Sequence, residues 1–185
     1  MKPALIVLLV TFLSVFKSYG QGMEEASDSS FAAPEFKFVT IDGDPVSSRN
    51  LRGKVIILDF WSSDCNPCRR SMPQLEEFYR RYKTDPRVSF YFVNSGWETL
   101  EKAKAFSSRG RSGVLLFSWG EKYDLPFAYD RGSSTLKAFG FDSNPSMVII
   151  DAKFRVRHKH AGYQENLSKY LSEMVDRYLS EKNVR

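Results

Sequence analysis

Two cysteines three residues apart, Cys65 and Cys68, are the only thiols in this chain of 185 residues. A pair at this spacing suits three roles: dithiol–disulfide exchange, a structural disulfide, or half of a metal site. A structural disulfide is the weakest of these, because closing so short a loop removes only about 2 kcal/mol of chain entropy. Exchange requires an accessible thiolate and a second thiol within bonding reach, and the pair offers both.

A metal site would need further ligands, for which the chain offers His158 and His160. Alternate residues of a strand point to the same side, so the two imidazoles could converge. The alternation of His with Lys in this segment is, however, also typical of a solvated edge strand. We therefore favour exchange and predict no metal and no cofactor, with a copper carrier using the cysteines and a histidine as an alternative.

The residues around the cysteine pair predict the place where a buried strand leads into a helix. An apolar run rich in β-branched residues, Val55–Leu58, lies within an expected strand at 54–61, and an amphipathic segment predicts a helix at 67–83. Cys65 then lies at the helix start, where unpaired N–H groups and the positive end of the dipole favour a thiolate. Pro67 suits the first helical position, because proline has no N–H to leave unpaired there.

The remaining pattern predicts strands that alternate with helices. Expected strands cover 88–94, 125–129, 147–150 and 154–160, and expected helices cover 98–106, 133–139 and 164–179. Alternation at 36–41 followed by turn residues at 42–45 predicts an N-terminal hairpin. Residues 113–119 are apolar enough for an extra strand or a helix end. Together these elements indicate an α/β fold, a central mixed sheet flanked by helices.

The N-terminus has the features of a secretory signal peptide. Lys2 precedes an apolar core at 4–16, and the small residues Ser18 and Gly20 fit a cleavage site before Gln21. We expect residues 1–20 to be removed and the protein to act outside the cytoplasm, in the periplasm, where disulfides persist. An uncleaved membrane anchor is the alternative.

Length and composition predict a single domain in the part of the chain that follows residue 20. Residues 21–33 are poor in large apolar side chains and predict a flexible leader. Residues 34–185 are long enough for one domain, and a chain with 42% hydrophobic residues can supply its core. The formal net charge of +5 comes without a run of basic residues or a nucleic-acid-binding motif, so we predict no nucleic-acid partner.

The stretch 59–68, with Asp-Phe-Trp followed by Cys-Asn-Pro-Cys, resembles the active-site region of thioredoxin-fold proteins. Three earlier motifs, Ala-Pro-Glu-Phe at 33–36, Asp-Gly at 42–43 and Leu-Arg-Gly-Lys-Val at 51–55, resemble the TlpA/ResA branch of extracytoplasmic thiol-disulfide oxidoreductases. The resemblance covers residues 33–163. It implies a thioredoxin-like fold and a reductase of protein disulfides, with a membrane-bound electron donor and an apocytochrome c, in cytochrome c maturation, as one substrate.

The resemblance also implies roles for single residues. Cys65 would attack the substrate and Cys68 would resolve the mixed disulfide. Asp59 matches the buried acid of thioredoxins, and burial raises the pKa of a carboxyl group, so Asp59 could accept a proton from Cys68. Trp61 would pack near the cysteines.

Four further residues are expected at the substrate-binding surface. Asn66 and Pro67 lie between the cysteines. Asn144 and Pro145 resemble the cis-proline loop of the family, which faces the cysteine pair and lends its backbone to an extended substrate. With Trp61, these residues make up the predicted substrate-binding set.

The chain departs from the family pattern in three places. Ser71 stands where the family often has an acid, Asn144 replaces the commoner Thr or Val, and segment 107–122 is longer than the usual connection. A peroxidase of the peroxiredoxin type is a further alternative, because Ser62 lies three residues before Cys65. Against it, Leu58 stands where the motif of that family has proline.

Overall fold

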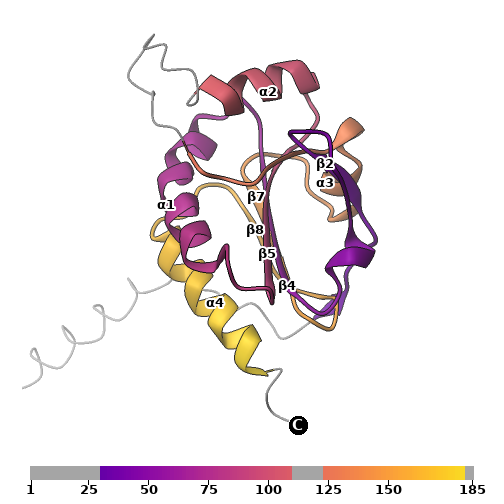
Figure 1. Cartoon of the computed structure of the whole chain (residues 1–185), viewed down its shortest axis with the longest axis vertical. Helices are drawn as coiled ribbons and strands as arrows, with labels where there is room; N and C mark the ends of the chain where they lie inside the picture. Colours follow the sequence, from indigo (N-terminus) through magenta and orange to yellow (C-terminus); the bar gives the residue numbers. More distant parts are fainter. Residues whose placement is uncertain (1–29, 110–122, 182–185) are drawn as a thin grey trace, which may run out of the picture.

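A computed structural model describes residues 30–109 and 123–181 (Figure 1). Its strands are β1 (Phe31–Ala32), β2 (Lys37–Thr40), β3 (Pro45–Ser47), β4 (Val55–Trp61), β5 (Val88–Asn94), β6 (Phe127–Tyr129), β7 (Ser146–Ile150) and β8 (Arg155–Ala161). Its α-helices are α1 (Asn66–Tyr82), α2 (Leu100–Arg109), α3 (Ser134–Ala138) and α4 (Leu167–Glu181), and the short 3-10 helices are η1 (Ser48–Leu51) and η2 (Arg131–Ser133).

The strands form one mixed sheet in the order β1-β8-β7-β4-β5-β6-β2-β3. The central strand β4 pairs in parallel with β5 and antiparallel with β7. All seven residues of β4 are buried, because both faces of the sheet are covered. The predicted fold class, an α/β sheet of the thioredoxin type with an N-terminal hairpin, is confirmed, and the hairpin is formed by β2 and β3.

Alternate residues of β4 contribute to two separate cores. Ile57 and Trp61 pack with side chains of α1 and α4 on one face, whereas Leu58 and Phe60 pack on the other face with Leu136 of α3. Figure 1 shows α1 and α4 together on one side of the sheet and α3 on the opposite side. The cysteine pair therefore belongs to the layer formed by α1 and α4.

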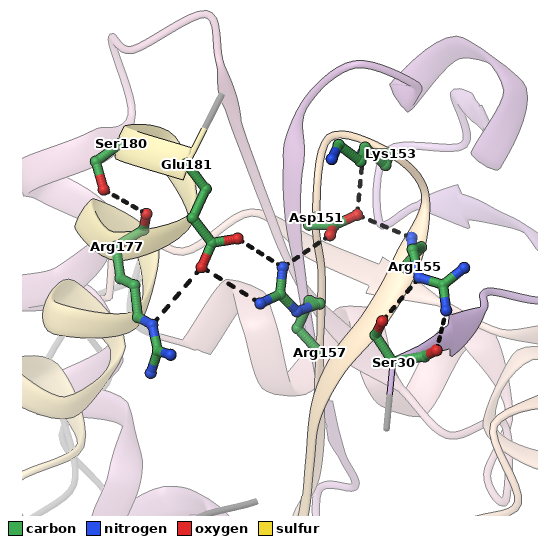
Figure 2. A network of polar contacts seen from close by, with 8 residues as sticks. All are labelled: Ser30, Asp151, Lys153, Arg155, Arg157, Arg177, Ser180 and Glu181. Atoms are coloured by element: carbon green, nitrogen blue, oxygen red, sulfur yellow. Dashed lines mark hydrogen bonds and ion pairs between the residues drawn. The ribbon is translucent and has the colours of Figure 1, made fainter. Parts of the chain in front are cut away.

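A polar network anchors the last helix to the sheet (Figure 2). Arg157 on β8 donates hydrogen bonds to Asp151, at 3.1 Å, and to Glu181 of α4, at 2.8 Å. Asp151 also accepts hydrogen bonds from the backbone N–H groups of Lys153 and Arg155, and so shapes the turn between β7 and β8. The network fixes the strand that carries both histidines.

Apart from β1 and the two 3-10 helices, the sequence pattern placed the described elements within a few residues of their observed bounds. The helix α1 continues through Pro73, as expected. The strand β1 was missed: it lies within the predicted leader 21–33, where it pairs antiparallel with β8. The predicted signal peptide 1–20, the predicted leader up to residue 29 and the apolar segment 113–119 lie outside the described residues. Within the described ranges, no helix is long and apolar enough to cross a membrane.

Candidate active site

Cys65 and Cys68 form a disulfide at the start of α1, with their Cα atoms 5.3 Å apart. Cys65 is the N-cap residue, and its sulfur accepts a hydrogen bond of 3.1 Å from the backbone N–H of Cys68. Cys65 is 9% exposed and Cys68 is 1% exposed, so Cys65 is the outer cysteine, though less open than predicted. A thiolate at Cys65 would take the place of a helix-capping oxygen.

Asn66 and Pro67 form the first helical residues, as expected. Asn66 is exposed and Pro67 is half-buried, so both can meet a partner that approaches Cys65. One turn further on, the buried hydroxyl of Ser71 donates a hydrogen bond of 3.2 Å to the carbonyl of Pro67. The first turn of the helix is thus held by its own side chains.

Glu98 fixes the loop that leads into the cysteine pair. Its carboxylate accepts hydrogen bonds from both the backbone N–H and the hydroxyl of Ser63 and from the amide of Asn94. Burial alone raises the pKa of Glu98, but the hydrogen bonds from Ser63, Asn94 and Lys102 outweigh it and lower the pKa. The charged carboxylate therefore helps to set the position from which Cys65 starts the helix.

Two basic side chains lie beside this loop. Arg69 donates a hydrogen bond to the carbonyl of Ser63 and lies over the ring of Phe106. Lys102 contacts both Asp64, at 2.6 Å, and Glu98, at 3.3 Å. Carboxylates thus partly neutralise the charge of Lys102, and the helix start adds positive potential at Cys65.

Trp61 belongs to the core, in one cluster with both cysteines as predicted, and its buried side chain does not form part of the expected substrate-binding surface. It is 1% exposed, and its indole N–H donates a hydrogen bond of 3.0 Å to the carbonyl of Phe92. Its ring stacks on that of Phe92, with centroids 5.2 Å apart. Since the side chain has no free surface, Trp61 supports the end of β4 from inside.

The bond between Asn144 and Pro145 is cis, in agreement with the cis-proline loop that the resemblance implied. Ser95 connects this loop to the active-site strand: its hydroxyl donates to Asn144, at 2.6 Å, and contacts the carbonyl of Trp61. The loop is therefore held beside the end of β4, from which the chain continues to the cysteines. Pro145 is buried, whereas Asn144 is half-buried, so only part of the loop faces solvent.

Asp59 is buried in the protein interior, as predicted. The side chain is 3% exposed, and burial raises the pKa of its carboxyl group well above the usual value. Asp59 lines a cavity of about 10 Å³ together with Ser71, Pro145 and His160. Ser71 lies one turn after Cys68 on α1, so the cavity adjoins the helical turn that follows the inner cysteine.

The two histidines do not join the cysteines in a metal site. His158 lies against the hydroxyl of Tyr170, with ring nitrogens 3.0 and 3.1 Å from it, while His160 lines the cavity beside Asp59. Across residues 30–109 and 123–181, no group of three or more His, Cys, Asp or Glu side chains could hold a metal ion. The arrangement required for a copper carrier with a histidine ligand is therefore not seen.

Sequence reasoning missed the polar residues that support the site from a distance, namely Ser63, Ser95 and Glu98. Their long-range contacts join residues 31 to 49 positions apart, such as Asn144 and Ser95. No local pattern reports such contacts. The only signal was a concentration of polar residues after the strand at 88–94, which is also typical of an ordinary loop.

Comparison with known proteins agrees with this geometry. The protein family described as Redoxin matches residues 25–174. The thiol-disulfide oxidoreductase ResA of Bacillus thuringiensis is 27% identical over 92% of this chain and 94% of its own length. The thioredoxin-like protein YneN of Bacillus subtilis is 26% identical over 85% of this chain and 86% of its own length.

Solved structures support the same fold. A structure from Chlorobium tepidum, described as a thiol:disulfide interchange protein DsbE, has a TM-score of 0.66 at 25% identity and covers 81% of this chain and 96% of its own. StoA from Bacillus subtilis has a TM-score of 0.60 at 22% identity and covers 77% of this chain and 96% of its own. The expected thioredoxin-like fold and enzyme class, a thiol-disulfide oxidoreductase, are confirmed, and the chain belongs to the Redoxin family.

Proposed function

We propose that this protein reduces disulfide bonds of other proteins outside the cytoplasm. The observation that carries the proposal is the cysteine pair itself: Cys65 caps a helix start, and Cys68 lies one turn deeper and within bonding distance. Such a pair exchanges with a substrate through a mixed disulfide on the outer sulfur. The ResA relatives, which are named thiol-disulfide oxidoreductases, support the same chemistry.

In the proposed reaction the Cys65 thiolate attacks a substrate disulfide, and one substrate sulfur leaves as a thiolate. Cys68 then transfers its proton to Asp59 and attacks Cys65, so that the Cys65–Cys68 disulfide forms and the second substrate sulfur is released. Two electrons pass to the substrate sulfurs, which take up their two protons from solvent. The buried carboxyl of Asp59 suits the proton transfer, because its raised pKa brings it closer to that of a thiol.

The remaining substrate surface is proposed to be the cis-proline loop and the turn between the cysteines. Asn144 is a half-buried residue of that loop whose amide nitrogen is buried, and Asn66 is exposed on the helix start. The backbone of an extended peptide could pair with the loop beside the cysteine pair. Apocytochrome c, which the resemblance implied as a substrate, is proposed as one such partner.

The donor of electrons is proposed to be a membrane-bound protein, and the signal-like residues 1–20 are proposed to direct export. Export is tested by expressing the full chain in a bacterial host and determining the N-terminus of the protein recovered from the periplasm. Cleavage before Gln21 is expected. A protein retained at the membrane with residues 1–20 attached would instead support the anchor.

The function is tested by reduction of insulin with dithiothreitol as the electron source, followed by precipitation of the insulin B chain. The wild-type protein is expected to accelerate precipitation, and the variant with both cysteines changed to serine is the matched control. Consumption of hydrogen peroxide by the reduced protein is measured in parallel. Rapid peroxide turnover without insulin reduction would favour a peroxidase and contradict the proposal.

A further inference from the structure

Two buried polar atoms on the same cavity have no hydrogen-bond partner within the described chain. They are Oδ1 of Asp59 on β4 and Nε2 of His160 on β8. Both side chains line the cavity of about 10 Å³ that adjoins the helical turn after Cys68. Buried polar groups are almost always paired in native proteins, so two unpaired atoms around one cavity indicate that something polar lies between them.

The sheet register explains how these side chains reach the same cavity. Asp59 lies directly opposite Met147 on β7, and Met147 lies opposite His160 on β8. Residues opposite one another in an antiparallel pair point to the same face, so Asp59 and His160 both point toward α1 and α4. Two strand spacings separate their backbones by about 10 Å, and Met147, which lies between them on β7, lines the same cavity.

A single water molecule fits this space by size and by chemistry. A cavity of this volume holds about one water molecule, and a buried water needs two to four polar partners. Asp59 and His160 supply two, and the hydroxyl oxygen of Ser71, which also lines the cavity, can accept a further hydrogen bond.

We propose that Asp59 and His160 share a buried water molecule and that His160 takes over the proton that Asp59 receives from Cys68. This inference rests on the proposed function and adds His160 as a positioning residue for its second step. The proton moves from the Cys68 thiol to Asp59, then through the water to Nε2 of His160, and from the half-buried imidazole to solvent. Asp59 thereby returns to its carboxylate form, while the electrons pass only between sulfur atoms.

Among the described residues that line the cavity, His160 is the only titratable side chain besides Asp59. The helix α1 contributes Ser71, one turn after Cys68, and α4 contributes the apolar Leu167. Gln164, from the turn before α4, is polar but does not titrate. On β8, His158 lies next to His160, with ring centroids 6.4 Å apart.

His158 provides a matched control because it shares the strand and the face of His160. Its ring nitrogens contact the hydroxyl of Tyr170, and its side chain does not line the cavity. Replacement of either histidine by glutamine removes one titratable ring from the same strand. Only the change at His160 alters the proposed water site.

The test uses the reduced full-length protein and 5,5′-dithiobis(2-nitrobenzoate) in a stopped-flow experiment. Attack by Cys65 releases the first thionitrobenzoate, and attack by Cys68 on the mixed disulfide releases the second. His160→Gln is expected to leave the first release unchanged and to slow the second about tenfold, with an altered pH profile. His158→Gln is expected to leave both releases unchanged. In an Asp59→Asn background, His160→Gln should cause no further slowing, because the two residues act in one path.

Each outcome separates the inference from the proposed function. If His160→Gln leaves the second release and its pH profile unchanged, or slows it equally with and without Asp59, the shared water path is wrong while thiol exchange stands. If the wild-type protein does not release the second thionitrobenzoate at all, the proposed function itself fails.

A second measurement does not require a variant at His160. Asp59→Asn is expected to shift the imidazole ¹⁵N resonances of His160 but not those of His158, because the shared water connects only His160 to position 59. Equal shifts at both rings, or none at either, would overturn the proposal even if the His160 variants did not fold.

Discussion

The backbone N–H of Cys68 donates a hydrogen bond of 3.1 Å to the sulfur of Cys65. The same N–H can donate to a Cys65 thiolate after reduction, and a hydrogen bond to the charged form stabilises it. Cys68 lies deeper, at 1% exposure, where a charge is costly. The helix start thus makes the two sulfurs unequal, with Cys65 as the attacking one and Cys68 as the resolving one.

This inequality predicts opposite phenotypes for the two serine variants. Cys65→Ser should lose insulin reduction by on the order of a hundredfold or more, because no thiolate attacks. Cys68→Ser should still attack but should accumulate mixed disulfides with the substrate, visible on non-reducing gels and by mass spectrometry. Turnover of Cys68→Ser at the wild-type rate would show that the roles are assigned wrongly.

Asp59→Asn should stabilise the folded protein at neutral pH. Burial raises the pKa of Asp59 above its unfolded value, so the folded state holds the proton more tightly. The stability contributed by the protonated acid is complete below the unfolded pKa and is lost as pH rises through the folded pKa. Asparagine cannot ionise and avoids this loss.

The stabilisation by Asp59→Asn is measured by comparing the melting temperatures of the variant and the wild type at pH 4 and at pH 8. A rise of several degrees at pH 8 is expected, since about 1 kcal/mol corresponds to roughly 2–4 °C at this size. The exposed Asp142→Asn serves as the control and should change neither value. A lower melting temperature for Asp59→Asn at pH 8 would contradict the role of the buried charge.

Glu98→Gln should loosen the loop before the cysteine pair. The Glu98 side chain is 7% exposed, and its carboxylate accepts hydrogen bonds from Ser63 and Asn94. Because hydrogen bonds to a charged group contribute about 1.5–3 kcal/mol each, we expect a loss of unfolding free energy on the order of 1–3 kcal/mol by urea titration.

The lowered pKa of Glu98 gives this effect a pH signature. Its stability contribution is present above about pH 4.5 and is lost as pH falls through the lower folded pKa, so the wild type and the variant should converge in acid. The exposed Glu101→Gln is the control on the neighbouring helix α2. A Glu98 variant that is as stable as the control at pH 7 would rule out the anchoring role.

His158 should make the protein sensitive to mild acid. Burial, with a smaller contribution from the charge of His160, lowers the pKa of His158 from 6.5 to about 4. Between these values the unfolded chain binds more protons, so stability is complete above about pH 6.5 and falls as pH decreases toward 4. Urea titrations at pH 7, 5.5 and 4 should show this decline, and His158→Gln should flatten it. An unchanged slope in the variant would place the acid sensitivity elsewhere.

The junction of β4 and α1 could be predicted from sequence because the signals there are local. A run of β-branched residues requires burial on both faces, and Pro67 after the first cysteine is typical of a helix start. The observed strand Val55–Trp61 starts one residue later than predicted, and the observed helix Asn66–Tyr82 starts and ends one residue earlier than predicted. The cis bond at Pro145 followed only from the resemblance, because the sequence of an X-Pro bond does not determine its isomer.

The polar residues that support the site, Ser63, Ser95 and Glu98, could not be predicted, because their contacts depend on the tertiary fold. Ser63 meets Glu98 across 35 residues of sequence, and neither residue stands in a recognisable motif. Two residues, as in β1, are too few to show a strand period. His160 was interpreted as a metal ligand or a solvated residue, because only the sheet register reveals that it shares a face with Asp59.

The most direct test of the central claim is alkylation of the reduced, folded wild-type protein with iodoacetamide at several pH values. The modified residue is identified by mass spectrometry. The helix start predicts that Cys65 reacts first, with a midpoint below the value of about 8.5 typical of a free thiol, while Cys68 reacts far more slowly. Preferential modification of Cys68, or no reaction of Cys65 at neutral pH, would contradict the account.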